Sequence, residues 1–118
     1  MSVNGIWIFE IAGIYGWERI STTFLEKGRY LSGGAIMFSH GVYTVKGKKF
    51  SAHVDVTQHN DKQTVFGEKR RTFSVELTAK YKEDKIEGKA RLKGSKSTVA
   101  EYKFRLLRLA PLPAIPKK

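Results

Sequence analysis

The sequence predicts an all-β fold, in which an antiparallel meander of eight strands closes into a barrel or a sandwich. Apolar and polar residues alternate along most of the chain, which is typical of strands because successive side chains point to opposite faces. Turn signals, most of them with glycine, separate the alternating runs at near-regular spacing. No convincing helical period is present. Closing the sheet also removes the exposed edges that invite aggregation.

The N-terminal half is predicted to form five strands, at residues 4–11, 19–27, 29–37, 41–46 and 49–58. The first is apolar on both faces: Ile6 and Ile8 lie on one face, and Trp7, Phe9 and Ile11 lie on the other. Only one face of a barrel strand can point inward, so the other should meet a partner chain or a covering segment. We therefore assign Trp7, Phe9 and Ile11 to a homodimer interface.

The C-terminal half is predicted to form three strands, at 70–81, 84–94 and 99–109. The first alternates most cleanly, with Phe73, Val75, Leu77, Ala79 and Tyr81 on one face. The pair Leu106-Leu107 breaks the alternation of the last strand and predicts a bulge. Residues 59–70 do not alternate, and we expect a loop or a lid over one mouth of the barrel.

The strands should be joined by short turns. These are predicted at Lys27-Gly28, Gly33-Gly34, His40-Gly41, Lys46-Gly47, Glu83-Asp84 and Lys93-Gly94-Ser95. At Gly33-Gly34, the missing side chains also allow a strand to kink or another backbone to approach closely. We predict one barrel domain over residues 1–109, followed by an extended proline-rich tail over 110–118.

Composition restricts the possible functions. A chain of 118 residues fits one domain that can bury a core without disulfides or metals. It contains no cysteine, which rules out disulfides, thiolate metal sites and a cysteine nucleophile. It has no recognisable secretory signal and no apolar stretch of about 20 residues that could span a bilayer. We expect a soluble, cytoplasmic protein.

Motifs for catalysis and metal binding are weak. The glycine-rich stretch 26–43 lacks both the Lys-Ser/Thr of a phosphate loop and the three spaced glycines of a dinucleotide site. No serine or threonine lies in a nucleophile elbow. His53, Asp55, His59 and Asp61 are close in sequence, but we expect an exposed strand face there because a metal site needs converging ligands. We predict no catalytic residues, no metal and no cofactor, and hence no enzyme.

Glu10 is a separate case because it follows an apolar run. If it faced inward, it would be a buried carboxylate with a shifted pKa. The alternation instead places it with Ile6 and Ile8, and we expect it to reach water where the strand ends, since isolated buried carboxylates are costly.

The net charge of +11 is compatible with a solvated surface that keeps the protein soluble, or with attraction of an acidic protein, a nucleic acid or an anionic membrane. The predicted basic partner surface consists of Lys46, Lys48, Lys49, Lys85, Lys89, Arg91, Lys93, Lys103 and Arg105. Nucleic-acid surfaces usually combine such charges with exposed aromatic rings. In the last strands the aromatic residues alternate inward, opposite the lysines. This pattern favours an acidic protein partner or phosphate attraction over base reading.

The inward aromatic residues raise a second possibility. An eight-stranded barrel is just wide enough either to fill with side chains or to hold one small ligand. If it holds an apolar ligand, the candidates for lining the cavity are Phe24, Tyr43, Phe50, Phe73, Tyr81, Tyr102 and Phe104. The sequence leaves both alternatives open.

The N-terminal half also carries a family pattern. It consists of Gly5 with Trp7, Tyr15-Gly16, and then the stretch "EKGRYLSGGAIMFSHGVY" with Lys27-Gly28, Gly33-Gly34, and Gly41 with Tyr43. Over about the first 60 residues, this pattern resembles the GrlR family of small bacterial regulators.

The resemblance implies a lipocalin-like barrel of eight strands, a homodimer and an apolar internal cavity. It also implies a non-enzymatic negative regulator that sequesters a transcription activator of type III secretion genes. Two departures matter. Ala35 replaces the aspartate of the family's Gly-Gly-Asp, and the family's acidic surface loop is basic here, through Lys46, Lys48 and Lys49. Because a basic loop repels a basic DNA-binding partner, we expect the fold to carry over and the partner to differ.

We therefore predict a non-enzymatic regulatory or binding protein of the GrlR type, acting through protein contacts as a homodimer. The alternatives are a carrier or sensor of a small apolar ligand and an electrostatic nucleic-acid binder.

Overall fold

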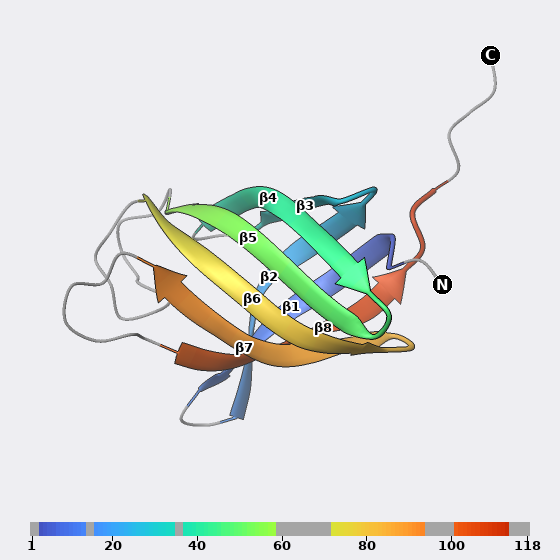
Figure 1. The fold of residues 1–118 in the computed structure, drawn as a ribbon. Coiled ribbons are helices and arrows are strands. Elements are labelled where there is room, and N and C mark those ends of the chain that lie inside the picture. Colours follow the sequence, from blue (N-terminus) through green and yellow to red (C-terminus); the bar gives the residue numbers. More distant parts are fainter. Residues whose placement is uncertain (1–2, 14–15, 35–36, 59–71, 94–100, 114–118) are drawn as a thin grey trace, which may run out of the picture.

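The computed structural model describes residues 3–13, 16–34, 37–58, 72–93 and 101–113, which form eight strands and no helix. The strands are β1 (Gly5–Gly13), β2 (Gly16–Glu26), β3 (Arg29–Gly33), β4 (Met37–Lys46), β5 (Lys49–Gln58), β6 (Thr72–Lys82), β7 (Lys85–Lys93) and β8 (Glu101–Ala110). Each strand pairs antiparallel with the next, and β8 pairs with β1 (Figure 1). The predicted eight-stranded up-and-down barrel is confirmed. The described residues contain no helical segment that could serve as a membrane span.

The described tight turns all lie at one end of the barrel, which we call the turn end. They connect β2 to β3, β4 to β5, and β6 to β7. Lys27 and Gly28 have φ values of 45° and 86°, and positive φ at both central residues is what a tight hairpin turn requires. Turns at Lys27-Gly28 and Glu83-Asp84 are confirmed, and the turn predicted at Lys46-Gly47 falls on Gly47-Lys48. The turn predicted at 93–95 and the loop at 59–70 lie mostly or wholly outside the described residues.

The N-terminal residues pack against the turn end. Val3 is buried, and the indole Nε1 of Trp7 donates a hydrogen bond to the Val3 carbonyl at 3.0 Å. The Arg108 guanidinium donates to the Asn4 carbonyl at 2.8 Å and lies 4.5 Å from the centre of the Trp7 ring. The Tyr43 hydroxyl donates to the Asn4 side chain at 3.1 Å. These contacts hold the start of the chain against three different strands.

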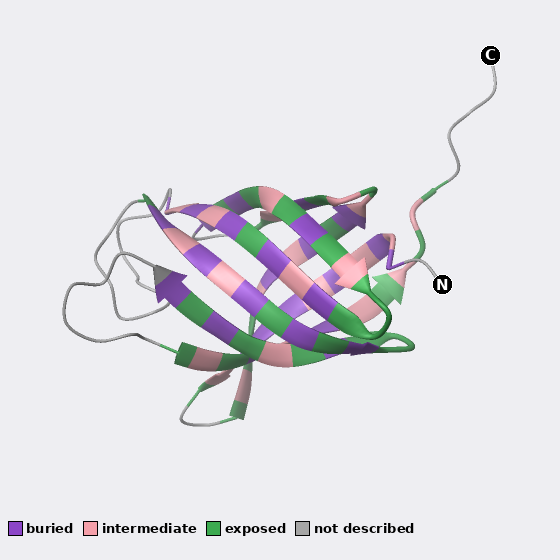
Figure 2. Cartoon of the chain, viewed as in Figure 1, coloured by how far each residue is buried: buried purple, intermediate pink, exposed green. Residues whose placement is uncertain are grey.

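The core follows from the alternation. Buried and exposed residues alternate along β4 to β7 (Figure 2). The inward side chains predicted for the 70–81 strand, Phe73, Val75, Leu77, Ala79 and Tyr81, are all buried. Aromatic rings on neighbouring strands meet inside: Phe9 of β1 stacks on Phe104 of β8, and Tyr43 of β4 stacks on Phe50 of β5, each pair with ring centres 5.5 Å apart.

The boundary between β3 and β4 differs from the prediction. We expected strands at 29–37 and 41–46, but β3 ends at Gly33 and β4 begins at Met37. The hairpin closes there because the Gly34 amide donates to the Met37 carbonyl at 2.9 Å. The predicted turn at His40-Gly41 is wrong, since both residues lie within β4. A Cβ on Gly41 would lie 2.1 Å from the His53 carbonyl oxygen, so this glycine allows a close approach of β5.

The bulge predicted at Leu106-Leu107 is also misplaced. Leu106 is fully buried and Leu107 is half-buried on the outer face, so the alternation continues through them. The irregularity lies further on, where Trp7 pairs with Arg108 and Ile6 pairs with Ala110. Leu109 is the extra residue, as a β-bulge requires. Strand β8 ends at Ala110, close to the domain boundary predicted after residue 109, and residues 111–113 form no strand.

Candidate functional site

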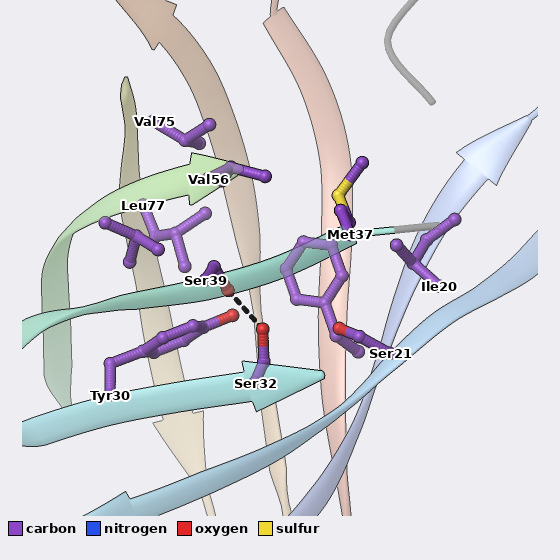
Figure 3. Close-up of a pocket in the computed structure, with 11 residues that line it drawn as sticks. Ile20, Ser21, Tyr30, Ser32, Met37, Ser39, Val56, Val75 and Leu77 are labelled. Atoms are coloured by element: carbon purple, nitrogen blue, oxygen red, sulfur yellow. Dashed lines mark hydrogen bonds between the residues drawn. The ribbon is translucent and has the colours of Figure 1, made fainter. Parts of the chain in front are cut away.

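The interior contains a small cavity lined by residues of strands β1 to β6 (Figure 3). Hydroxyl groups of Ser21, Ser32 and Ser39 line one side, and the Ser32 and Ser39 hydroxyls share a hydrogen bond. Apolar side chains, including Val56 and Leu77, line the other side. The cavity volume is about 30 Å³, which holds one or two water molecules. Pockets for ordinary small-molecule ligands have volumes of roughly 300 Å³ or more.

None of the residues predicted to line an apolar cavity lines this one. Phe50, Phe104, Tyr43, Phe73 and Tyr81 are core residues that fill the barrel, and Tyr102 is half-buried against them. The prediction for Phe24 is wrong: it is 40% exposed. Its register partners are Ile6 and Leu31, which place it on the outer face. The cavity described between these strands is too small for an apolar ligand of ordinary size.

Tyr30 lines the same cavity and was not singled out from the sequence. It is buried, and burial raises the pKa of its phenol above the usual value, while the neighbouring Thr23 side chain opposes the shift. The phenol therefore remains protonated at physiological pH and is suited to polar contacts inside the barrel. The sequence did not reveal the role of Tyr30, because its strand has only five residues and shows no clear alternation.

The predicted dimer-interface residues are wrong. Trp7, Phe9 and Ile11 point inward and are 0%, 6% and 5% exposed. The alternation was correct but the choice of face was reversed. The larger aromatic side chains fill the barrel, while Ile6 and Ile8 are half-buried on the outside.

Glu10 is also placed differently from the prediction. Strand β1 continues to Gly13, so Glu10 lies within the strand and its side chain is only 6% exposed. Its two carboxylate oxygens accept hydrogen bonds from Arg19 at 3.2 Å and from Arg105 at 2.7 Å. Arg105 lies 4.1 Å from the centre of the Trp17 ring. This outer cluster links β8, β1 and β2, the strands that close the barrel.

Apolar side chains gather on the outside of β8, β1, β2, β3 and β4. We call this the outer apolar face, and it consists of Ile6, Ile8, Phe24, Leu31, Phe38 and Leu107. Phe24 pairs with Ile6 and with Leu31, and Ile8 pairs with Leu107. Phe24, Leu31 and Phe38 are 40%, 45% and 44% exposed. Exposed apolar patches of this kind mark interaction sites in soluble proteins.

A basic hollow lies at the turn end of β4, β5, β6 and β7. We call it the lysine groove; its walls carry Lys46, Lys48, Lys49, Lys80 and Lys89. Thr78, Ala79 and Gly88 form its floor, Glu87 also lines it, and its volume is about 800 Å³. The Lys48 carbonyl accepts a hydrogen bond from the Tyr81 amide at 2.7 Å. This bond holds the β4–β5 turn against β6 and shapes one wall.

The predicted basic surface divides into paired and unpaired charges. Lys85 pairs with Glu87 at 3.1 Å, Lys89 and Arg91 pair with Glu101 at 3.4 and 3.6 Å, and Arg105 pairs with Glu10. Lys103 lies opposite Lys89 on the outer face, and the Lys93 side chain is outside the described part. Within the described ranges, Lys46, Lys48, Lys49 and Lys80 form no ion pair.

The sequence named four of the five groove lysines but missed Lys80. The alternation of the 70–81 strand already placed Lys80 on the polar face. Its role was not visible because the groove forms where two hairpins meet, and Lys80 lies opposite Lys49 across β5 and β6.

No group of three or more metal-ligating side chains is found among the residues that the structure describes. His53 lies opposite Glu76 in the sheet. The Asp55 carboxylate accepts a hydrogen bond from Ser74 at 2.8 Å. His59 and Asp61 lie outside the described residues.

No protein-family model matches the chain, and a search of curated proteins finds no match. The resemblance to the GrlR family therefore stays a prediction from the residues that carry it.

Proposed function

We propose that this chain is a non-enzymatic regulatory protein that acts by stoichiometric contact with a protein partner. It would work in the cytoplasm as a homodimer, in the manner of the GrlR-type negative regulators that it resembles, which sequester a transcription activator of type III secretion genes. One observation carries the proposal. The cavity described inside the barrel has a volume of only about 30 Å³, whereas the outside carries both an apolar face and a basic groove. Such a molecule is suited to surface contacts.

The proposal is tested by titrating the purified chain into a transcription activator encoded beside its gene. We expect saturable heat release in calorimetry at a fixed molar ratio, because sequestration is stoichiometric. The promoter binding of the activator, followed by fluorescence anisotropy, should disappear at the same ratio. Full promoter binding in a large excess of the chain would contradict the proposal.

We assign the homodimer contact to the outer apolar face. The sheet is closed, so a second copy cannot add to a strand edge and must pack on a face. Each copy carries +11, and like-charged copies repel unless their contact surface is nearly neutral. Arg29 beside this face forms an ion pair with Glu26, and Arg108 forms one with Asp84. Of the unpaired groove lysines, only Lys46 lies on a strand of this face, at the opposite end of β4 from Phe38, so two copies can meet here with little repulsion.

The dimer assignment predicts a separation of assembly from stability. We expect the double variant Phe24→Glu, Leu31→Glu to sediment as a monomer, while the wild type sediments at twice the chain mass. At a chain concentration where the wild type is also monomeric, the free energy of unfolding should change by no more than about 0.5 kcal/mol, because both side chains are exposed in the single chain. Thr44→Glu adds a charge to an exposed outer position of β4 and should leave the dimer intact. A wild-type monomer in sedimentation equilibrium would contradict the assignment.

A further inference from the structure

We propose that the lysine groove binds an extended acidic segment of the partner protein. This inference deepens the proposed function, on which it rests, by naming the surface and the chemistry of the contact. The partner would present aspartate and glutamate side chains from a segment without secondary structure of its own.

The first support is an electrostatic cost within the fold. Lys46 lies directly opposite Lys49, and Lys49 lies directly opposite Lys80. Like charges at directly opposite positions of a sheet destabilise it. Glu87 lies opposite Lys80 on β7 but forms its ion pair with Lys85. No carboxylate in the described part of the chain therefore forms an ion pair with these three ammonium groups. Where a fold keeps such a local conflict, the position is usually functional. Carboxylates from a partner would turn this repulsion into attraction.

The second support is the shape of the groove. Its floor consists of Thr78, Ala79 and Gly88, none of which has a side chain larger than that of threonine. The backbone of an extended segment can therefore lie close to the sheet. Neighbouring strands are about 4.8 Å apart, and the same-face side chains of an extended segment recur about every 6.7 Å. Flexible lysine side chains on adjacent strands can reach successive carboxylates at these spacings.

The third support separates an acidic protein from a nucleic acid. The described residues that line the groove include no aromatic ring for base stacking and no arginine for a bidentate phosphate contact. Along β7 and β8, ion pairs with Glu87 and Glu101 hold Lys85, Lys89 and Arg91. The unpaired lysines of the groove cluster at the turn end of β4, β5 and β6 and do not form a long stripe that would follow a duplex.

The test uses a fluorescently labelled peptide of alternating glutamate and serine, with fluorescence anisotropy as the readout. We expect saturable binding to the full-length chain that weakens as salt rises, because the contact is charge-assisted. Lys80→Glu should lower the affinity for the peptide at least tenfold. The matched control, Lys27→Glu, changes the net charge equally at an exposed position in the β2–β3 turn and should bind almost as well as the wild type.

Folding of the variant is checked separately. The thermal midpoint of Lys80→Glu should stay nearly unchanged, because the new carboxylate lies opposite Lys49 on β5 and opposite Glu87 on β7, and the attraction and the repulsion offset each other. A labelled DNA duplex of random sequence is measured in parallel. The inference is overturned if the peptide does not bind at low salt, or if Lys80→Glu and Lys27→Glu weaken peptide binding equally. It is also overturned if the wild type binds the duplex more tightly than the peptide and Lys80→Glu abolishes duplex binding.

These results distinguish the two proposals. If the activator is sequestered normally by Lys80→Glu, the groove assignment fails and the regulatory function stands. If the peptide binds the groove but the activator is never sequestered, the groove stands and the proposed function fails.

Discussion

Gly88→Ala is expected to destabilise the barrel by about 3 kcal/mol, the upper range for forcing an extra methyl group into a packed site. A Cβ at this position would lie 2.0 Å from the Thr78 carbonyl oxygen and 2.5 Å from the Ala79 Cα atom. Both obstacles are backbone atoms of β6, so no side-chain rotation can relieve the clash. Strands β6 and β7 would have to separate, with loss of ladder hydrogen bonds. Urea unfolding followed by tryptophan fluorescence measures the change.

Gly33→Ala is the matched control. It introduces the same methyl group at a strand glycine, but a Cβ there meets no atom of another residue within 4 Å. Gly33 is not among the glycines with positive φ, so alanine should change stability by less than about 0.5 kcal/mol or stabilise slightly through the unfolded state. Equal unfolding midpoints for the two variants would show that β6 does not approach Gly88 as closely as described.

The glycines show where sequence reasoning reaches its limit. Gly28 and Gly41 both follow a polar residue and precede a strand-like run. Gly28 is a turn glycine with φ of 86°, whereas Gly41 lies within β4 against the backbone of β5. Both roles need a residue without a side chain. Only the register of the neighbouring strand distinguishes them, and that register depends on residues far along the chain.

The fold was predictable because alternation and turn residues are local. The alternation fixed the inward set of β6, from Phe73 to Tyr81, without knowledge of the neighbouring strands. The face of β1 was not predictable in this way, because both of its faces are apolar. Side-chain volume decided it: a small barrel needs Trp7 and Phe9 inside to reach native packing density. The isoleucines then form the outside.

The candidate site was partly predictable for the same reason. Lys46, Lys48 and Lys49 are close together in sequence and share one turn region, so the sequence alone predicted them as part of a basic surface. The ion pair between Glu10 and Arg105 joins the first and last strands. Such long-range pairs remove charges from the predicted surface, and no local pattern reveals them. The division into paired and unpaired cations, on which the groove proposal rests, therefore required the three-dimensional structure.

Trp7→Ala is expected to destabilise the chain by about 3–5 kcal/mol, the usual cost of truncating a fully buried tryptophan. Trp7 is 0% exposed. Its loss would leave a cavity at the turn end, remove the hydrogen bond to the Val3 carbonyl and remove the ring beneath Arg108. Chemical unfolding followed by circular dichroism measures the change. Trp7→Phe keeps most of the side-chain volume, so its loss of unfolding free energy should be clearly smaller than that of Trp7→Ala.

The same substitution decides between the two faces of β1. If Trp7 lay at an interface between copies, alanine would split the dimer and leave the fold of each copy intact. If Trp7 fills the barrel, the Trp7→Ala substitution lowers the free energy of unfolding, and the folded fraction of the variant still forms dimers. Phe24→Ser, on the opposite face of the sheet, should show the reverse. The free energy of unfolding of the single chain should stay close to that of the wild type, and dimerisation should weaken. A stable, monomeric Trp7→Ala variant would therefore contradict both the inward position of Trp7 and the dimer contact assigned to the outer apolar face.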